Sequence, residues 1–341
     1  MLLILNCGSQ SIKWKLFTDN LKVKKKGKKE VFNSKNYQKI LIEALKKIPE
    51  DVEIIGHRVV HGGEKFRKPI KINKNLLKEL EKFNELAPLH NPFNILGIKI
   101  SQRLFPKKSQ IVVFDTEFYT DLPERSCIYP LPENIRKKYG FQRLGFHGIS
   151  HEYAAEQGAK KIKKTFKKLK IITCHLGGGS SITAIKNGRA VDTSMGFTPM
   201  EGLMMMTRTG DIDSGIVLEL AQKFSLKKVN KILNFESGLK GISGLSDMKK
   251  ILKAVEKRNK KAGLALEVFV YRIQKYIGAY FAVLGGCDLL VFTGAIGWED
   301  GDKKIKSRVC KNLHFLDKTK VVAIKPNEEL AIANKIIRIY K

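Results

Sequence analysis

Apolar runs that stop at turns rich in glycine and hydroxyl groups recur along the chain. From Leu2 to Phe17, an apolar run, a Gly-Ser-Gln-Ser turn and an alternating apolar and polar segment predict strand, tight turn and strand. The same order returns from Lys170 to Ile185, around a Gly-Gly-Gly-Ser-Ser turn. A weak internal repeat of this kind predicts two α/β domains of similar design, each opening with a β-hairpin.

A third glycine turn and several helical stretches complete the expected fold. The turn lies at Thr293–Gly297, after the buried-looking strand Leu289–Phe292. Three- and four-residue spacing of apolar positions predicts helices, and the longest one is apolar on several sides in its second half. We expect that half, Phe269–Leu284, to be buried against the other domain or a second subunit. The predicted helices are Tyr37–Ile48, Lys74–Leu86, Lys249–Leu284 and Asn327–Tyr340.

Length and composition favour a soluble protein of two domains. A chain of 341 residues can bury two hydrophobic cores. We place the boundary near Phe114, with residues 1–114 and the returning helix at 326–341 in the first domain and residues 115–325 in the second. No apolar run reaches the roughly 18–20 residues of a membrane span, and the opening run is too short for an export signal. The five cysteines are odd in number and widely spaced, so we expect a reducing cytoplasm.

The net charge of +31 raises the question of a polyanionic partner such as nucleic acid. Most of the excess is Lys in short clusters, with few interleaved aromatic residues on which bases would stack. A solvated helix surface tolerates Lys at little cost. We therefore expect a lysine-rich surface and no nucleic-acid partner.

The glycine turns are candidates for binding phosphate. Backbone N–H groups and hydroxyls in such a turn can converge on an anion, although most glycine turns are plain hairpins. Two matched copies and a third turn after a strand favour a nucleotide held between two domains. The sequence has no Gly-x-x-x-x-Gly-Lys-Ser/Thr motif and no His-Arg-Asp or Asp-Phe-Gly set, which excludes P-loop NTPases and protein kinases.

Two arginines and an aspartate follow strand-like or glycine-containing segments and predict a polar cleft. Arg58 ends a strand-like run, Asp115 follows the apolar strand at 111–114, and Arg208 precedes Gly-Asp. Each one taken alone would be explained as a helix cap or a surface ion pair. Histidines four residues apart, at 57 and 61 and at 147 and 151, suggest metal ligation. Zinc is not favoured, because neither pair carries His-Glu-x-x-His and no cysteine lies close.

Longer strings of residues give the chain a family resemblance. The chain resembles the acetate kinase family, in its acetate and propionate kinase branch, within the actin-like ATPase superfold. The strings span the chain in the order of the family: Asn-Cys-Gly-Ser at Asn6, Gly-His-Arg-Val-Val-His-Gly-Gly-Glu at Gly56, Leu-Ala-Pro-Leu-His-Asn-Pro at Leu86, Phe-Asp-Thr at Phe114, Gly-Phe-His-Gly-x-Ser-His at Gly145, Cys-His-Leu-Gly at Cys174, Asp-Thr-Ser-Met-Gly-Phe-Thr-Pro-Met-Glu-Gly at Asp192, Thr-Arg-Thr-Gly-Asp at Thr207, Ser-Gly-Leu at Ser237 and Asn-Glu-Glu-Leu at Asn327.

The resemblance implies a fold, an activity and partners. The fold would be two duplicated actin-like (ribonuclease H-like) ATPase domains with a nucleotide cleft between them. The activity would be reversible, direct in-line phosphoryl transfer from ATP to acetate, giving acetyl phosphate and ADP, with propionate or butyrate kinase as the alternative. Mg²⁺, or Mn²⁺ in its place, would accompany the nucleotide. The second domain would carry the nucleotide site and a homodimer interface.

Roles for single residues follow from the same resemblance. It implies that Arg58 and Arg208 bind the carboxylate and the transferring phosphoryl group, and that His147 donates a hydrogen bond to the equatorial oxygens. We assign Asp115 to orienting Arg or Mg²⁺, because a carboxylate nucleophile needs no strong base at pH 7. The metal ligands would be Asn6 and Glu328. The apolar pocket for the methyl group of the acid, next to Arg58, would consist of Val60, Leu89, Phe146 and Pro199.

The nucleotide site is where the chain departs from the family pattern. Gly178 replaces the usual Asn of the phosphate turn, and the adenosine turn Gly-Ile-Gly-Glu-Asn appears as Ala295-Ile296-Gly297-Trp298-Glu299. Trp298 either stacks beside the adenine or packs into the surrounding loop. The expected nucleotide-binding residues are Lys13, His175, Gly177, Gly178, Gly179, Ser180, Asp247, Gly294, Ala295, Ile296, Gly297 and Trp298.

Two other classes of protein compete with the kinase interpretation. An actin-like protein that binds ATP without transferring phosphate would be expected to lack Arg58, Asp115, Arg208 or Glu328, and all four are present. A basic nucleic-acid-binding protein would be retained on DNA in a salt-dependent way. Sequence alone leaves the chain length of the acid, the physiological direction and the preferred nucleotide open.

Overall fold

Both predicted hairpins are confirmed, and each belongs to the sheet of its own unit. The computed structural model describes residues 1–8, 11–31, 36–49, 51–63, 65–66, 68–84, 87, 90–300 and 304–340. β1 (Leu2–Cys7) pairs antiparallel with β2 (Ser11–Phe17), and β7 (Lys170–Leu176) pairs antiparallel with β8 (Ser180–Lys186). In the first hairpin, Ser9 and Gln10 of the turn lie outside the described residues.

Internal contacts divide the chain into two units. The first unit contains Met1–Thr120, Phe146–Ile149 and Asn327–Lys341, and the second contains Asp121–Gly145 and Ser150–Pro326. The predicted domains, 1–114 with 326–341 and 115–325, stay a prediction. Among the helices of the described residues, none is both long and apolar enough to span a membrane.

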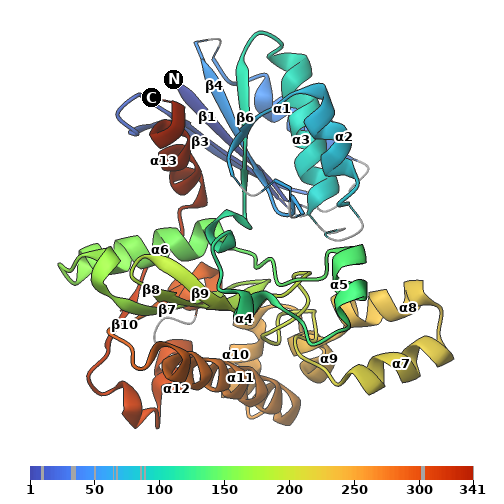
Figure 1. The fold of residues 1–341 in the computed structure, drawn as a ribbon, viewed down its shortest axis with the longest axis vertical. Helices are drawn as coiled ribbons and strands as arrows, with labels where there is room; N and C mark the ends of the chain where they lie inside the picture. The colour runs from blue at the N-terminus through green and yellow to red at the C-terminus, as the bar shows by residue number, and fades with distance from the viewer. Residues whose placement is uncertain are drawn as a thin grey trace. The chain divides into compact units, whose positions relative to one another are not determined.

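The first unit is a mixed sheet in the order β3-β2-β1-β4-β6-β5, covered on both faces. Helices α1, α2 and α3 lie on one face and α13 on the other (Figure 1). All six residues of β1 are buried, as expected for a strand between two layers. The remaining elements are β3 (Val23–Glu30), β4 (Ile54–Val59), β5 (Ile70–Lys71), β6 (Ser109–Phe114), α1 (Tyr37–Leu45), α2 (Lys74–Glu81), α3 (Asn91–Leu104) and α13 (Glu328–Tyr340).

Gly56 lets α13 approach the sheet of the first unit closely. A Cβ at Gly56 would overlap the Cδ1 atom of Ile336 on α13 and lie 2.6 Å from Cδ1 of Ile4 on β1. Leu3 and Leu5, which point to the opposite face of β1, belong to a core cluster with α1 and α3 residues. The C-terminal helix is therefore packed directly on β1 and β4, which brings its first residues to the ends of these strands.

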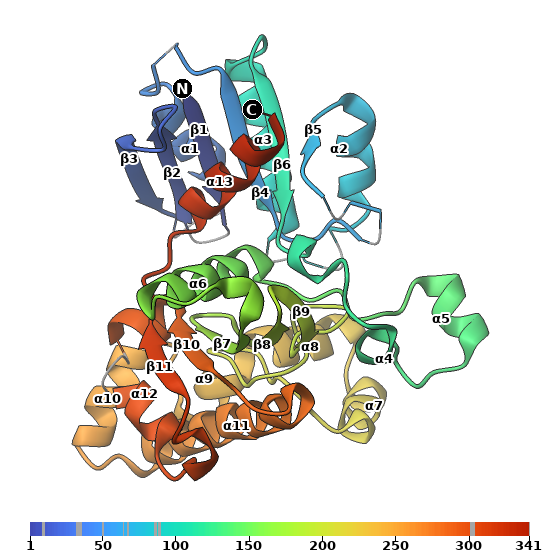
Figure 2. The same cartoon turned by 60° about the vertical axis from the view of Figure 1, so that its left-hand side comes forward.

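The second unit has the sheet order β11-β10-β7-β8-β9 and the same layered design. Helix α6 lies on one face, where Gly158 contacts Leu289 and Val291 of β10, and α11 covers the other face with its neighbours (Figure 2). The elements are β9 (Arg189–Thr193), β10 (Leu289–Thr293), β11 (Lys320–Ala323), α4 (Glu124–Cys127), α5 (Glu133–Tyr139), α6 (Gly148–Lys161), α7 (Ser214–Lys223), α8 (Leu226–Lys231), α9 (Gly238–Ser243), α10 (Met248–Glu256), α11 (Lys260–Leu284) and α12 (Lys304–Cys310).

The single long helix predicted from Lys249 to Leu284 is wrong. The chain forms two helices, α10 and α11, because Arg258 takes a left-handed conformation (φ 58°) and Asn259 caps α11 by accepting a hydrogen bond from the Ala262 N–H group. The expected burial of Phe269–Leu284 against the other domain or a second subunit stays a prediction. Within its own unit, α11 packs on β7 and β8 and on the neighbouring helices α9, α10 and α12, while Tyr271 and Val283 are 61% and 53% exposed.

The other predicted helices are confirmed. α1 ends at Leu45 and α2 at Glu81, both earlier than expected, and α13 begins one residue after the expected Asn327. Residues 85 and 86, the expected end of α2, lie outside the described residues.

His57 on β4 is a structural histidine of the first unit. Its side chain is 2% exposed, and Nε2 shares a hydrogen bond of 2.9 Å with Oε1 of Gln110 on the neighbouring strand β6. Burial lowers the pKa of His57 to about 4, and the bond to Gln110 offsets only part of that effect. The ring is therefore neutral at pH 7, and its Nε2 atom is already hydrogen-bonded to Gln110, which does not favour the suggested metal ligation with His61.

His57 makes the stability of the protein sensitive to acid. Between pH 6.5 and 4 the unfolded chain binds a proton on His57 and the folded chain does not, so stability falls with falling pH, by about 3 kcal/mol in all. We expect His57→Gln to reduce the shift of the urea midpoint between pH 7 and pH 4.5. His314→Gln, at an exposed histidine, is the matched control. Equal shifts in the two variants would contradict the assignment.

Candidate functional site

Arg58, at the end of β4, is the centre of a polar network in the first unit. Its Nε and Nη2 atoms donate to the two carboxylate oxygens of Asp115, at 2.9 and 2.6 Å. Its Nη1 atom donates to Oε2 of Glu328 at 3.1 Å and to Oδ1 of Asn6 at 3.3 Å. The guanidinium group thus binds three other predicted site residues, and its pairing with Asp115 has the two-pronged geometry that makes arginine–carboxylate pairs strong.

The topology of the sheet explains why these residues meet. β1, β4 and β6 are parallel neighbours, so Asn6, Arg58 and Asp115 come to the same edge of the sheet. The register fixes the position of Asp115, whose N–H group donates to the Val59 carbonyl at 3.0 Å. Glu328 reaches the same edge as the first residue of α13, where an N-terminal carboxylate is favoured by the helix dipole.

Burial and charge act against each other in this network. Burial raises the pKa of Asp115, and the Arg58 guanidinium offsets part of that rise. For Arg58, burial acts to lower the pKa, but the charges of Asp115 and Glu328 outweigh it and hold the pKa above its usual range. Arg58 therefore remains a partly buried cation that depends on its carboxylate partners.

A second ion pair holds the start of α13, and sequence reasoning missed it. Nζ of Lys15 on β2 lies 2.9 Å from Oε2 of Glu329 and 2.5 Å from Oδ1 of Asn327. Lys13, the predicted nucleotide ligand, is exposed and lies opposite Asn6 in the β1–β2 ladder. The pair stabilises the position of Glu328 beside Arg58. Local patterns cannot reveal it, because its partners are more than 300 residues apart.

Two asparagines of α3 fix the segment that follows β4. Asn94 accepts from the Val60 N–H group at 3.1 Å and donates to the Cys7 carbonyl at 2.6 Å, so it joins the ends of β1 and β4. Asn91 accepts from the His61 N–H group and donates to the His61 carbonyl, at 3.0 and 2.8 Å. Asn91 lies in the Leu-His-Asn-Pro string, which was a signal for it, whereas nothing in the sequence marked Asn94.

Phe146 and His147 lie beside these segments in the first unit. The Phe146 ring is fully buried, 5.3 Å from the ring of His61, and its carbonyl accepts from the Tyr119 hydroxyl at 2.9 Å. His147 has a φ of 58°, unusual for a non-glycine residue, and the next N–H group donates to the Asp115 carbonyl at 2.8 Å. Strained backbone of this kind is concentrated at functional sites. Leu89 lies outside the described residues.

The second unit carries the predicted phosphate turn at the end of β7. The turn closes on itself through hydrogen bonds from the Gly177 N–H group to the Gly179 carbonyl at 3.0 Å and to Ser180 Oγ at 3.4 Å. A Cβ added at Gly178 would meet no atom within 4 Å, so the tip of the turn is open. Nδ1 of His175 is hydrogen-bonded to Ser150 Oγ at 2.8 Å. A Cβ at Gly177 would lie 3.7 Å from Nε2, so this nitrogen faces the turn.

The predicted adenosine turn lies next to the phosphate turn. β10 is paired with β7, so that Thr293 lies opposite His175. Gly294 has a φ of 83°, and a Cβ there would overlap the Leu176 carbonyl, so only glycine fits. Beyond it, Ala295 is exposed and Trp298 is half-buried on a π-helical turn. Asp247 lies at the surface, where its Oδ1 accepts from the Lys250 N–H group and caps α10.

Arg208 is the second arginine of the predicted site, and its environment differs from that of Arg58. It is 7% exposed, and its Nη1 atom donates to the Pro199 carbonyl at 2.8 Å. Burial lowers the pKa of Arg208 to about 10. A desolvated cation of this kind gains free energy when an anion binds to it.

The residues around Arg58 can also be tested as a magnesium site. Asn6 Oδ1 and Glu328 Oε2 face the same guanidinium, and amide and carboxylate oxygens are ligands that Mg²⁺ accepts. In the described part of the chain, no group of three or more His, Cys, Asp or Glu side chains is arranged to hold a metal. Mg²⁺ typically takes one or two protein oxygens and fills its shell with water and phosphate oxygens, so this sparse set fits it.

Comparison with known proteins gives the class and then the family. The acetate kinase of Dictyoglomus turgidum is 41% identical over 99% of this chain and 97% of its own length. Solved structures that share the fold include the acetate kinase of Porphyromonas gingivalis (TM-score 0.87, 34% identity, 100% and 99% of the two chains) and a propionate kinase of Francisella tularensis (0.88, 34%, 98% and 98%). The chain is thus of the class of ATP-dependent carboxylate kinases.

A family model gives the more specific assignment. The model of the acetokinase family matches residues 30–319. The chain belongs to the acetokinase family, which confirms the resemblance and the α/β, actin-like fold class inferred from the sequence.

Arg208 offers a test that separates charge from geometry. We expect Arg208→Lys to lower kcat by more than the change in side-chain length suggests, because an ammonium group cannot bind two oxygens as a planar fork does. Burial would also lower the pKa of the new lysine, so activity should fall further as pH rises, whereas Arg208 stays charged up to about pH 10. The measurement is kcat and KM for acetate against pH. An unchanged kcat with only a raised KM would mean that Arg208 binds the ground state alone.

Proposed function

We propose that this enzyme is an acetate kinase that transfers the γ-phosphoryl group of ATP directly to acetate and forms acetyl phosphate and ADP. The network around Arg58 is the observation that carries the proposal. It presents a partly buried cation whose carboxylate partners hold it in place at the edge of the sheet. Positioning and charge neutralisation are what phosphoryl transfer requires of a protein.

The pairing of Asp115 supports a role in orientation. Both of its oxygens already accept hydrogen bonds from Arg58, at 2.9 and 2.6 Å. Acetate is ionised at pH 7, so its oxygen can attack phosphorus without a base to remove a proton. In this proposal Asp115 holds the Arg58 guanidinium. Arg58 and Arg208 neutralise the carboxylate and the phosphoryl group in transfer, and His147 donates to the equatorial oxygens.

We assign the nucleotide to the two neighbouring turns of the second unit. The phosphate turn Gly177–Ser180 offers backbone N–H groups, and His175 adds a donor that Ser150 orients. The turn Gly294–Trp298 would receive the adenosine, with the half-buried Trp298 as its aromatic side chain. Lys13 and Asp247 complete the proposed set, from β2 and from the start of α10.

Mg²⁺ is part of the proposal, with Asn6 and Glu328 as its protein ligands. The ion would neutralise charge on the phosphate oxygens. Mn²⁺ accepts the same oxygen ligands and would be expected to replace it.

The apolar residues proposed around the methyl group of the acid favour acetate as substrate and leave propionate as the second candidate. Val60, Phe146 and Pro199 are apolar and buried in their own units, as walls around a methyl group must be. Leu89 would be the fourth wall. A hydrophobic pocket separates acids that differ by one methylene by about 1–3 kcal/mol, so propionate should be a poorer substrate that still reacts.

We propose a homodimer formed through the second unit. α7 has no buried residue although it carries Ile216 and Leu218, which are 51% and 66% exposed, and Leu226 on α8 is 77% exposed. We expect the interface to cover these exposed apolar side chains of α7 and α8. The mass in solution, measured by light scattering, should be twice 38.6 kDa, and a monomer at micromolar concentration would contradict the proposal.

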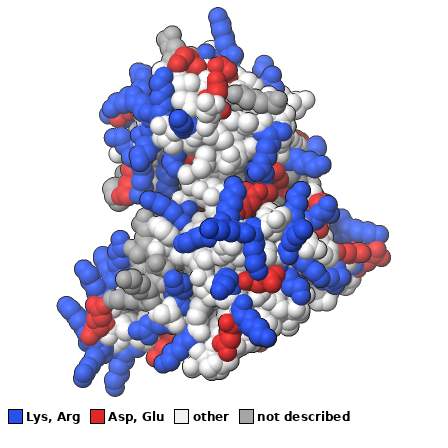
Figure 3. All heavy atoms as spheres, turned by 90° about the vertical axis from the view of Figure 1, so that its left-hand side faces the viewer, with Lys and Arg blue, Asp and Glu red and all other residues white. Residues whose placement is uncertain are grey.

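The cysteines and the surface charge support the proposal of a cytoplasmic enzyme with no nucleic-acid partner. All five cysteines are free thiols, as expected in a reducing compartment. On the face drawn in Figure 3, Lys and Arg side chains are spread widely and interrupted by Asp and Glu. Stacking surfaces for bases would require aromatic residues between the cations.

One coupled assay tests the proposed activity. The enzyme is incubated with ATP, Mg²⁺ and acetate, propionate or butyrate, and hydroxylamine traps the acyl phosphate as a coloured hydroxamate. We expect the highest kcat/KM with acetate, a lower value with propionate, and no product after EDTA treatment until Mg²⁺ is restored. ATP hydrolysis without hydroxamate would indicate an ATPase and contradict the proposal. A higher kcat/KM with propionate would favour the second candidate.

A further inference from the structure

The loop between β9 and α7 carries two of the proposed site residues, Pro199 and Arg208. The backbone around Arg208 is fixed by the segment before α9: Thr209 N–H donates to the Leu233 carbonyl at 3.2 Å, and Ser237 N–H donates to the Thr207 carbonyl at 3.1 Å. The tip of the Arg208 side chain is bonded to the Pro199 carbonyl at 2.8 Å. The position of Pro199 therefore sets the direction of the guanidinium group.

Residues on both sides of Pro199 are held by a single pair of side chains. The Phe197 N–H group donates to Tyr129 Oη at 2.9 Å, and Tyr129 Oη in turn donates to Oε2 of Glu201. A Cβ at Gly196 would overlap both Tyr129 Oη and Glu201 Oε2, so the pair lies directly on the backbone of the loop. Each held residue is two positions from Pro199.

Arg143 packs beside this pair, and each nitrogen of its guanidinium group donates at least one hydrogen bond. Nη2 donates to Oε1 of Glu201 at 2.5 Å, Nη1 donates to the carbonyls of Thr193 and Ser194 at 3.0 and 3.3 Å, and Nε donates to the Ser126 carbonyl at 3.1 Å. The guanidinium carbon also lies 5.7 Å from the centre of the Tyr129 ring. Burial acts to lower the pKa of Arg143, but the charge of Glu201 outweighs it and raises the pKa.

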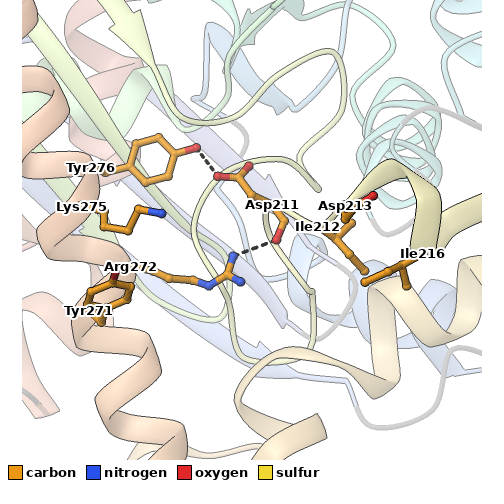
Figure 4. Close-up of a pocket in the computed structure, with 8 residues that line it drawn as sticks. All are labelled: Asp211, Ile212, Asp213, Ile216, Tyr271, Arg272, Lys275 and Tyr276. Atoms are coloured by element: carbon orange, nitrogen blue, oxygen red, sulfur yellow. Dashed lines mark hydrogen bonds between the residues drawn. The ribbon is translucent and has the colours of Figure 1, made fainter.

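The far end of the loop has its own attachment at Asp211. Tyr276 and Arg272 of α11 point toward Asp211 (Figure 4): Tyr276 Oη donates to Oδ2 at 2.6 Å, and Arg272 Nη1 donates to the carbonyl at 2.8 Å. Asp211 Oδ1 accepts from the Gly202 N–H group at 2.8 Å. The loop is thus fixed at residues 196–202 and at 211, and Arg208 lies between the two attachments.

We propose that Arg143, Glu201 and Tyr129, the Arg143 clamp, are positioning residues that hold Pro199 and thereby direct Arg208 at the carboxylate and phosphoryl groups. The inference rests on the proposed acetate kinase function, because Arg208 has a target only if that reaction takes place. The clamp acts through the loop and does not touch substrate. It should therefore affect the reaction of the acid more than the binding of the nucleotide.

Tyr129→Phe is the mildest test, because it removes one hydroxyl and keeps the ring under Arg143. We expect kcat to fall about tenfold and KM for acetate to rise, since one hydrogen bond of this strength is lost from the loop. KM for ATP should stay within about twofold. Tyr139→Phe is the matched control, at an exposed tyrosine of the same segment, and should leave both constants unchanged.

Glu201→Gln tests the charge at nearly constant shape. It leaves one oxygen acceptor, which can accept from Tyr129 or from Arg143 but not from both as the carboxylate does, and it leaves the Arg143 cation without its carboxylate. We therefore expect a larger loss in kcat than in Tyr129→Phe. Glu133→Gln is the control, because Glu133 is paired only with the surface residue Lys137 among the described contacts of α5. If Glu201→Gln does not fold, Tyr129→Phe still decides the proposal.

Amide hydrogen exchange gives a readout that does not depend on activity. Peptides covering residues 194–208 should exchange faster in Tyr129→Phe than in the wild type or in Tyr139→Phe. Unchanged exchange and unchanged kinetics would overturn the clamp, as would faster exchange with an unchanged kcat and KM for acetate. A wild-type enzyme that forms no acyl phosphate would overturn the proposed function instead, and the exchange data would still show whether the clamp holds the loop.

Discussion

The partly buried charge of Arg58 and the buried carboxylate of Asp115 are the constraint on which the first unit depends. A guanidinium group that is mostly removed from water must have partners, and removal of one partner of a buried pair costs about 3–5 kcal/mol. Asp115 and Glu328 are those partners, and Glu328 is 270 residues away in sequence. The returning helix α13 is thus required both to cover the sheet and to complete the charge balance of the site. The Lys15–Glu329 pair fixes the start of α13 beside Arg58. Asn94 fixes the segment that follows Arg58 by accepting from the Val60 N–H group.

The two arginines of the proposed site are prepared in opposite ways. Arg58 has carboxylate partners, and their charges hold its pKa above the usual range. For Arg208, burial lowers the pKa to about 10, and its Nη1 donates to the uncharged carbonyl of Pro199. The carboxylates therefore hold Arg58 in one position, whereas Arg208 is suited to bind an anionic group of the substrate. The Arg143 clamp would supply to Arg208 the positional control that carboxylates supply to Arg58.

Residues at the ends of strands could be predicted from the sequence, and residues that support them could not. Asn6, Arg58 and Asp115 each follow an apolar run, and parallel strands bring such positions together. Asn94 and Lys15 act through contacts with residues far away in the sequence, which leave no periodic pattern. Glu201 lies in the family string at Asp192, but its contacts with Tyr129 and Arg143 could not be predicted from it. The division of the long helix at Arg258 was missed because neither Gly nor Pro marks it. Periodicity gives the apolar positions of α11 and not the neighbour that covers each side of it, so what covers Tyr271 and Val283 could not be predicted either.

In the proposed mechanism, Arg58 and Asp115 act as one unit in which Asp115 orients the guanidinium group, and Asp115 is not an independent base. A double-mutant cycle on kcat/KM for acetate, with Arg58→Lys, Asp115→Asn and the double variant, tests it most directly. Circular dichroism and the urea midpoint confirm that each variant is folded. If the two residues act as one unit, the double variant loses about as much kcat/KM as the worse single variant. Losses that multiply would show instead that Arg58 and Asp115 act separately.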